Sequence, residues 1–145
     1  MPAFEIWTRR LLALLFGGMF VYAGVLKLKS PLLFQQSIRS FEMIGDPWTA
    51  LLALSLPWLE IFAGLAVIIG IFRQGGLLLL NLSLLMFFVA LGSAWYRGLN
   101  IDCGCFGSSD KTPDYTWLFI RDALLLTHGL VLMWLEHRRQ RNSPP

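Results

Sequence analysis

The stretch Leu11–Leu28, LLALLFGGMFVYAGVLKL, decides the class of fold. It carries a single charge, at Lys27, and about 20 apolar residues are enough to cross the hydrocarbon core of a bilayer as a helix. Arg9 and Arg10 precede it, and no clear A-x-A cleavage site follows it. We therefore expect a membrane span that is retained, rather than a cleaved signal peptide.

The composition of the whole chain agrees with this interpretation. Of its 145 residues, 56% are hydrophobic and only 14% are charged, whereas charged residues make up about 25% of an average soluble domain. The net charge is +3, and the basic residues cluster at the ends of apolar runs. This pattern is typical of membrane orientation and argues against a nucleic-acid partner. The lipid bilayer is the expected surrounding.

The hydropathy pattern predicts an all-α integral membrane four-helix bundle, one domain over residues 1–145, with a cysteine-containing loop between the third and fourth spans. The spans are expected at about residues 10–28, 48–72, 77–96 and 117–135. Between the first two spans, Phe34–Met43 is a candidate surface helix. Asp46 and Pro47 resemble the N-cap and first position of the second span. Arg73–Gly76 is predicted as a tight turn, and the tail His137–Pro145 as loose.

Four spans place both termini on one side of the membrane. Arginines cluster tightly at the two ends of the chain, and such clusters favour the cytoplasmic side. We therefore expect a multi-pass protein of the bacterial inner membrane with cytoplasmic termini. The loop before the fourth span then faces the periplasm.

That loop contains both cysteines of the chain, Cys103 and Cys105, separated by Gly104. A disulfide across so short a ring adds little stability, because the gain from cross-linking grows with loop length. Strain makes such a bond more oxidising, which favours a redox-active dithiol. Two alternatives stay open: thiolates that hold Cu(I) or share a zinc ion, and two small residues in a turn.

Several charged residues fall in the outer half of the predicted bundle: Lys27, Glu60, Arg97, Asp102, Arg121 and Asp122. A carboxyl group at membrane depth is costly, so it should face the bundle interior or a wet cavity. One interpretation is a buried ion-pair network that fixes helix register. The other is a polar cavity that relays protons or binds a quinone head, with Glu60 as the proton-handling group.

Two further side chains belong to this hypothesis. Arg121 would hold an anion or lower the pKa of a cysteine thiol. His128 lies on the same helical face, seven residues further on. A hydrogen bond from His128 to a neighbouring helix is the competing explanation.

Four segments give the chain a resemblance to the DoxX-like superfamily of small membrane proteins, and within it to the methylamine-utilisation MauE-type branch: Gly24–Leu28, Pro57–Leu65, Arg97–Gly107 and Arg121–Leu126. The resemblance implies a four-helix membrane protein linked to maturation of a disulfide-rich periplasmic enzyme subunit. It also implies quinone-linked redox chemistry in the wider superfamily. Carried over, it points to Cys103 and Cys105 as the redox pair and to Lys27, Glu60 and Arg121 as polar-site residues.

The leading hypothesis is a membrane thiol–disulfide oxidoreductase or redox relay component. Cys103, Cys105 and Glu60 are the predicted catalytic residues, Lys27, Arg121 and His128 the predicted quinone-binding residues, and no metal ligand is assigned. The expected partner is a periplasmic thiol protein. The alternatives are a non-enzymatic assembly or maturation factor with a partner-binding or copper-binding loop, and an oligomeric transporter that couples Glu60 to protons.

Overall fold

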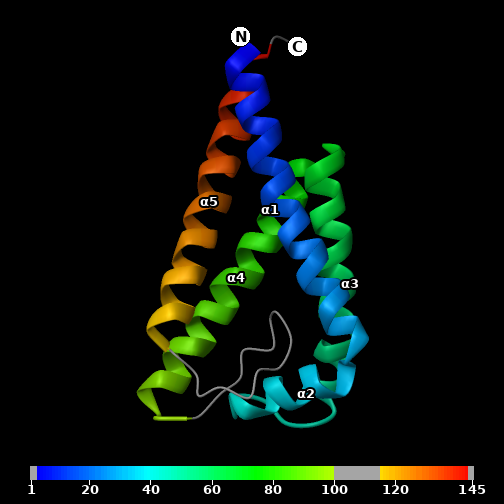
Figure 1. Cartoon of the computed structure of the whole chain (residues 1–145), viewed down its shortest axis with the longest axis vertical. Helices are drawn as coiled ribbons and strands as arrows, with labels where there is room; N and C mark the ends of the chain where they lie inside the picture. Colours follow the sequence, from blue (N-terminus) through cyan, green and yellow to red (C-terminus); the bar gives the residue numbers. More distant parts are fainter. Residues whose placement is uncertain (1–2, 100–114, 144–145) are drawn as a thin grey trace.

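The computed structural model describes residues 3–99 and 115–143. Within these ranges the chain forms five α-helices and no strand: α1 (Ala3–Lys29), α2 (Pro31–Ser40), α3 (Trp48–Ile69), α4 (Arg73–Tyr96) and α5 (Tyr115–Asn142) (Figure 1). All but α2 are long and apolar enough to cross a membrane. The all-α, four-span prediction is confirmed. Cys103 and Cys105 lie outside the described residues.

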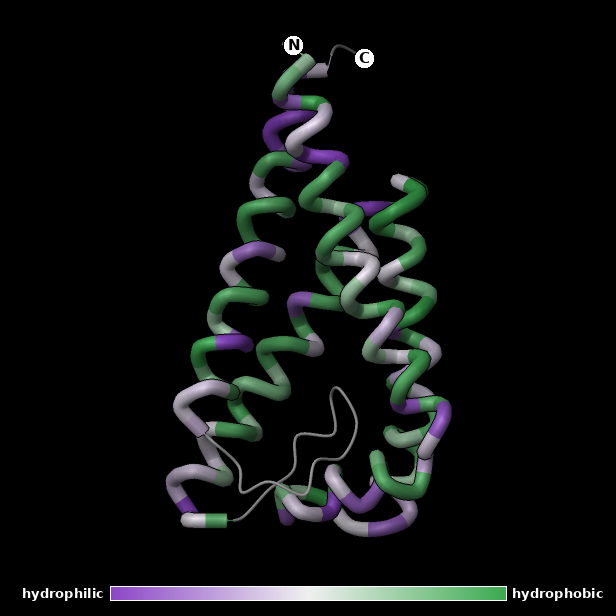
Figure 2. The backbone as a smooth tube through the Cα atoms, viewed as in Figure 1, coloured by the Kyte–Doolittle hydropathy of each residue, from purple (hydrophilic) through white to green (hydrophobic). Residues whose placement is uncertain are grey.

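The four long helices pack as two pairs, α1 with α3 and α4 with α5, and α3 also contacts α4. α1 and α5 lie side by side at the end that carries both termini, and they separate toward the opposite end, where α2 lies (Figure 1). Hydrophilic residues concentrate at the two ends of this bundle (Figure 2). Large apolar side chains such as Leu51, Leu54 and Phe62 point outward, as lipid contact requires.

The central core lies between α1, α3, α4 and α5. Its best-buried side chains come from all four of these helices, and they are Phe16, Val67, Leu77, Leu80 and Leu132. These residues fill the interior of the bundle, and groups of charged side chains lie on either side of them along the bundle.

Glycines bring α1 and α3 into backbone contact. A Cβ atom added at Gly17 would lie 2.6 Å from the carbonyl oxygen of Gly64, and one at Gly24 would lie 2.8 Å from that of Pro57. Small residues on one face allow membrane helices to approach this closely. Lys27 is buried on the same side of α1, so its side chain points into the bundle.

Several predicted boundaries differ from the structure: α1 begins at Ala3 and not at about residue 10, and the surface helix expected at Phe34–Met43 is α2, Pro31–Ser40. α3 ends at Ile69 because Gly70 adopts φ +93°, a left-handed conformation that ends a helix. The turn predicted at Arg73–Gly76 is wrong, since α4 already begins at Arg73. A Cβ on Gly76 would lie only 2.9 Å from the carbonyl oxygen of Ala63, so this glycine serves close helix packing. The tail predicted as loose is also helical, through Asn142.

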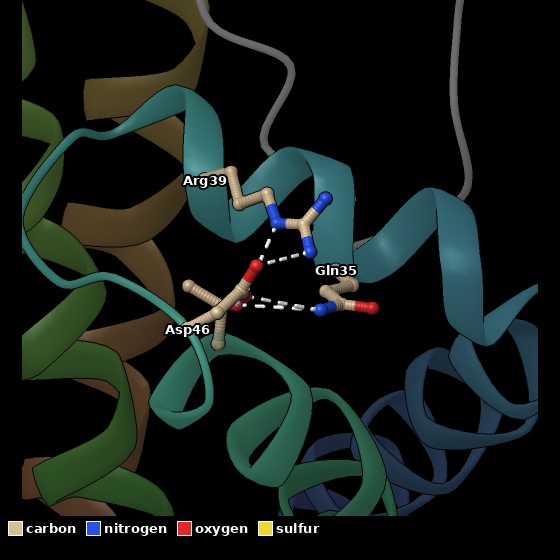
Figure 3. A network of polar contacts seen from close by, with 4 residues as sticks. Gln35, Arg39 and Asp46 are labelled. Atoms are coloured by element: carbon tan, nitrogen blue, oxygen red, sulfur yellow. Dashed lines mark hydrogen bonds and ion pairs between the residues drawn. The ribbon is translucent and has the colours of Figure 1, made fainter.

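A polar network holds α2 to the start of α3. Arg39 pairs with the Asp46 carboxylate at 2.5 Å, the amide of Gln35 donates to Asp46, and the hydroxyl of Thr49 donates to it as well (Figure 3). The expected N-cap is wrong by one residue, because α3 begins at Trp48 and Pro47 occupies the cap position. Asp46 instead binds the first turn of α3 through the side chain of Thr49.

Candidate functional site

Lys27 and Glu60 form a buried ion pair between α1 and α3. The Nζ atom of Lys27 donates to both carboxylate oxygens of Glu60, at 2.7 Å each. Only 1% of the Lys27 side chain and 2% of the Glu60 side chain are exposed. The pair occupies the last turn of α1 and the middle of α3.

Two aromatic rings complete the surroundings of the ammonium group. Nζ of Lys27 lies 5.0 Å from the ring centre of Phe34 in α2 and 5.3 Å from that of Phe87 in α4. Aromatic faces attract cations, and the attraction strengthens where water is excluded. Four helices, α1 to α4, therefore meet around one neutral pair of opposite charges.

A second charged pair reaches the same place from α5. The guanidinium of Arg121 donates to the Oδ1 atom of Asp122 from Nε at 3.1 Å and from Nη2 at 2.9 Å. Asp122 is 4% exposed. The two pairs border a common cavity whose lining residues are Met19, Phe20, Ala23, Lys27, Glu60, Leu84, Phe87, Arg121, Asp122 and Leu125.

This cavity, called here the polar cavity, has a volume of about 30 Å³. A cavity of this size holds about one or two water molecules, and it is far smaller than the roughly 300 Å³ of a small ligand pocket. The arrangement can therefore hold water between an ammonium–carboxylate pair and a guanidinium–carboxylate pair. Such a group of titratable side chains and water is suited to proton transfer.

The other predicted site residues lie elsewhere. The guanidinium of Arg97, at the end of α4, donates to the main-chain carbonyls of Phe41 and Glu42 and so holds the α2–α3 connection. Nε2 of His128 lies 3.2 Å from the carbonyl oxygen of Leu12 in α1. Arg97 and His128 do not line the polar cavity. Cys103, Cys105 and Asp102 fall outside the described ranges.

A larger cavity lies between α2, α3 and α4, and we call it the apolar cavity. Its volume is about 450 Å³. It is lined by Ile38, Phe41, Met43, Ile44, Leu52, Leu56, Leu82, Leu85, Met86, Phe87, Val89 and Ala90. Sequence reasoning missed it, because these side chains look like ordinary lipid-facing or core residues. Phe87 lines both cavities.

The apolar cavity adjoins a hydrophobic cluster that contains the described residues on either side of the cysteine segment. Phe41 and Ala90 line the cavity and belong to a cluster that includes Leu99 before that segment and Tyr115 after it. The hydroxyl of Tyr115 donates to the carbonyl oxygen of Leu99, which brings the two ends together.

Comparisons with known proteins agree with this architecture. Residues 5–135 match the family described as Methylamine utilisation protein MauE. The methylamine utilization protein MauE of Paracoccus denitrificans is 32% identical over 124 residues, which cover 84% of this chain and 64% of that protein. The chain thus spans less than two thirds of this relative's length. No solved structure matches the chain.

The family match extends over all four membrane-spanning helices and over both charged pairs of the polar cavity. The wider DoxX-like relationship stays a prediction. The protein is a multi-pass integral membrane protein, and it belongs to the MauE family of methylamine utilisation proteins.

Proposed function

We propose that this protein is a membrane thiol–disulfide oxidoreductase, or one component of such a relay, that serves protein maturation in methylamine utilisation. The observation that carries the proposal is the position of the ends of the cysteine segment. Leu99 and Tyr115 pack in one cluster with Phe41 and Ala90, which line the apolar cavity. The two ends of the cysteine segment are therefore anchored next to a space that could hold a lipid-soluble molecule.

The reaction has two balanced halves. A thiolate of the substrate attacks one sulfur of the Cys103–Cys105 disulfide, and a second substrate thiolate resolves the mixed disulfide. The substrate leaves as a disulfide, and Cys103 and Cys105 become a dithiol. The dithiol then gives two electrons and two protons to a quinone, which becomes a quinol, and the disulfide forms again.

The apolar cavity supports a quinone as the electron acceptor. Its volume of about 450 Å³ falls within the roughly 300–1,000 Å³ of small-molecule sites. Its lining is apolar, as the ring and chain of a lipid-soluble carrier require. The polar cavity admits only water-sized molecules, so its role in this proposal is to carry the protons. Glu60 is the proton-handling group, and Lys27 and Arg121 hold the charge balance. His128, predicted as a quinone-binding residue, contacts the carbonyl oxygen of Leu12 in α1 and does not line the apolar cavity, so it has no part in this quinone site.

The Paracoccus denitrificans relative is a methylamine utilization protein by name, which supports the link to that process. The proposed membrane is the bacterial inner membrane, with cytoplasmic termini and the cysteines on the periplasmic side, where disulfides form. The proposed substrate is a periplasmic thiol protein.

Thiol trapping in intact cells tests the cysteine chemistry. A membrane-impermeant alkylating reagent should label Cys103 and Cys105 only after reduction, because they rest as a disulfide on the outer face. The Cys103→Ser, Cys105→Ser variant should insert normally but leave the substrate protein reduced. Labelling without reduction, or oxidation of the substrate by this double variant, contradicts the proposal.

A pair of tryptophan substitutions tests the acceptor site. Leu85→Trp places a large ring at the apolar cavity, whereas Leu79→Trp lies on the same helix, at a similarly exposed position that does not line the cavity. We expect Cys103 and Cys105 to accumulate as thiols in the Leu85→Trp cells only. Equal redox states in the two variants would argue against a quinone in this cavity.

A non-enzymatic maturation factor is the second candidate, and the closed geometry of the Lys27–Glu60 pair favours it. A pair at 2.7 Å with both side chains buried is what a purely structural role requires. In this case the cysteine loop binds a partner protein or Cu(I). Copper that copurifies with the protein and is lost in the double cysteine variant would support this second function over the first.

A further inference from the structure

Three arginines from three helices surround one glutamate at the end of the bundle that carries the termini. Nη1 of Arg9 in α1 lies 3.8 Å from Oε2 of Glu136 in α5, and Nη1 of Arg73 in α4 lies 3.5 Å from the same oxygen. Nη1 of Arg139 lies 3.6 Å from the other carboxylate oxygen. The side chains of Arg9, Arg73 and Glu136 are 10%, 11% and 8% exposed.

The charges of this cluster do not balance. Within 4 Å, one carboxylate faces three guanidinium groups. The exposed Glu5 adds a second negative charge that acts on Arg9 from a longer distance, so three positive charges face two negative ones. A buried charge is costly unless an opposite charge accompanies it. The cluster therefore calls for an anion from outside the described part of the chain.

The distances also leave room for another acceptor. All three exceed the roughly 2.7–3.2 Å of a protein hydrogen bond, in contrast to the 2.7 Å of the Lys27–Glu60 pair. Within the described residues, the buried Nε of Arg9 and Oε2 of Glu136 have no hydrogen-bond partner. Nε of Arg73 donates to the carbonyl oxygen of Val67 at 3.0 Å, while its Nη1 faces Glu136.

The chemistry and the position of the cluster indicate which kind of anion it binds. Guanidinium groups pair with phosphate through two parallel hydrogen bonds. Arg139 is 47% exposed, which leaves the cluster open on one side. Trp7 and Trp134 are exposed at the same end of the bundle, as is typical of residues at the level of lipid head groups. Basic pockets between membrane helices bind anionic head groups at this level.

We propose that Arg9, Arg73 and Arg139 form a binding site for the phosphate group of an anionic phospholipid, at the end of the bundle that carries the termini. The lipid phosphate supplies the missing negative charge and joins α1, α4 and α5. This site lies at the opposite end of the bundle from α2, and it does not depend on the proposed redox function.

Native mass spectrometry of the purified full chain tests the site. Phosphatidylglycerol and phosphatidylcholine with identical acyl chains are offered as the two probes. We expect selective retention of phosphatidylglycerol, reduced about tenfold in Arg9→Gln and Arg73→Gln, because a charge-assisted hydrogen bond contributes about 1.5 kcal/mol or more. Arg10→Gln is the matched control, since Arg10 is the exposed neighbour of Arg9. Arg139→Gln, at the half-exposed position, serves if a buried variant does not fold.

The Glu136→Gln variant distinguishes a lipid site from a purely structural cluster, for which retention of phosphatidylglycerol would not increase. It removes the competing negative charge, so retention of phosphatidylglycerol should rise rather than fall. Inorganic phosphate, added as a competitor, separates the two sources of the anion. Phosphate binding without any preference for phosphatidylglycerol would assign a free anion and overturn the lipid site. Equal retention of both lipids, or an equal loss in Arg10→Gln and Arg9→Gln, would overturn it as well.

Discussion

Lys27 in α1 and Glu60 in α3 pair across the bundle interior, with the ammonium nitrogen 2.7 Å from each carboxylate oxygen. The contact joins residues that are 33 positions apart in the chain. Because both side chains are buried, bulk solvent does not compensate either charge if its partner is removed. The stability of the helix arrangement therefore depends on the two residues together.

Removing one member of this pair should be far worse than removing both. Glu60→Gln leaves the Lys27 ammonium buried without its counter-charge, and we expect a loss of about 3–5 kcal/mol in the free energy of unfolding. The Lys27→Met, Glu60→Leu double variant should recover most of that loss. Denaturant unfolding in detergent micelles measures both. A double variant no more stable than the single one would contradict this account.

The contact between α1 and α3 makes a sharp prediction for neighbouring glycines. A Cβ at Gly64 would lie 2.7 Å from the carbonyl oxygen of Gly17, so Gly64→Ala should cost about 1–3 kcal/mol through overpacking. A Cβ at Gly18 meets nothing within 4 Å. Gly18→Ala should instead be neutral or stabilise by about 0.5–1 kcal/mol, because alanine favours the helix. Thermal unfolding of the two variants, compared with the parent, checks the contrast.

The network at the start of α3 predicts acid sensitivity. The Thr49 hydroxyl, followed by the Arg39 guanidinium, lowers the pKa of Asp46 below its ordinary value of 3.8. A lowered pKa in the folded state gives stability that is present above the unfolded pKa and lost as the pH falls through the folded one. Unfolding midpoints measured from pH 6 down through the acid range should show this loss. Asp46→Asn should flatten the profile, and Thr49→Val should move it to higher pH; an unchanged Asp46→Asn profile would refute the assignment.

Arg97 should control the mobility of the α2–α3 connection. Its guanidinium donates to the carbonyls of Phe41 and Glu42, which follow α2. In Arg97→Ala these contacts are lost, and local opening should become easier by about 0.5–1.5 kcal/mol. Amide hydrogen exchange over residues 41–47 measures the change. Exchange in α5 is the internal control, and faster exchange there would indicate a global effect instead.

Sequence patterns predicted the four spans well because a bilayer demands long apolar helices. The length of each apolar run can be read directly from the sequence. They failed at Arg73–Gly76, where a charge and two glycines imitate a turn. The structure uses Gly76 for close approach to the Ala63 carbonyl. The helical tail was missed because its polar composition resembles a loose end, whereas Arg139 in the tail pairs with Glu136 one turn earlier in the same helix.

The candidate site was predictable in part. Lys27, Glu60 and Arg121 stand out as charges within apolar helices, and the structure brings all three to one cavity. The apolar cavity was not predictable, because it depends on how α2 lies against α3 and α4. The arginine cluster depends on the rotation of three helices about their axes, which no single-helix pattern contains. From the sequence, the arginines of this cluster could be interpreted only as indicators of membrane orientation.

The position of Glu60 also imposes an order on the insertion of this protein during its synthesis. Lys27 sits in the last turn of α1, where a long side chain can extend to the interface, but Glu60 lies in the middle of α3. Placing a charged side chain at the centre of a span costs about 2.5–3.5 kcal/mol during translocon-mediated insertion. α1 leaves the ribosome first and offers the ammonium that cancels this cost. α1 therefore carries the counter-charge that α3 needs inside lipid.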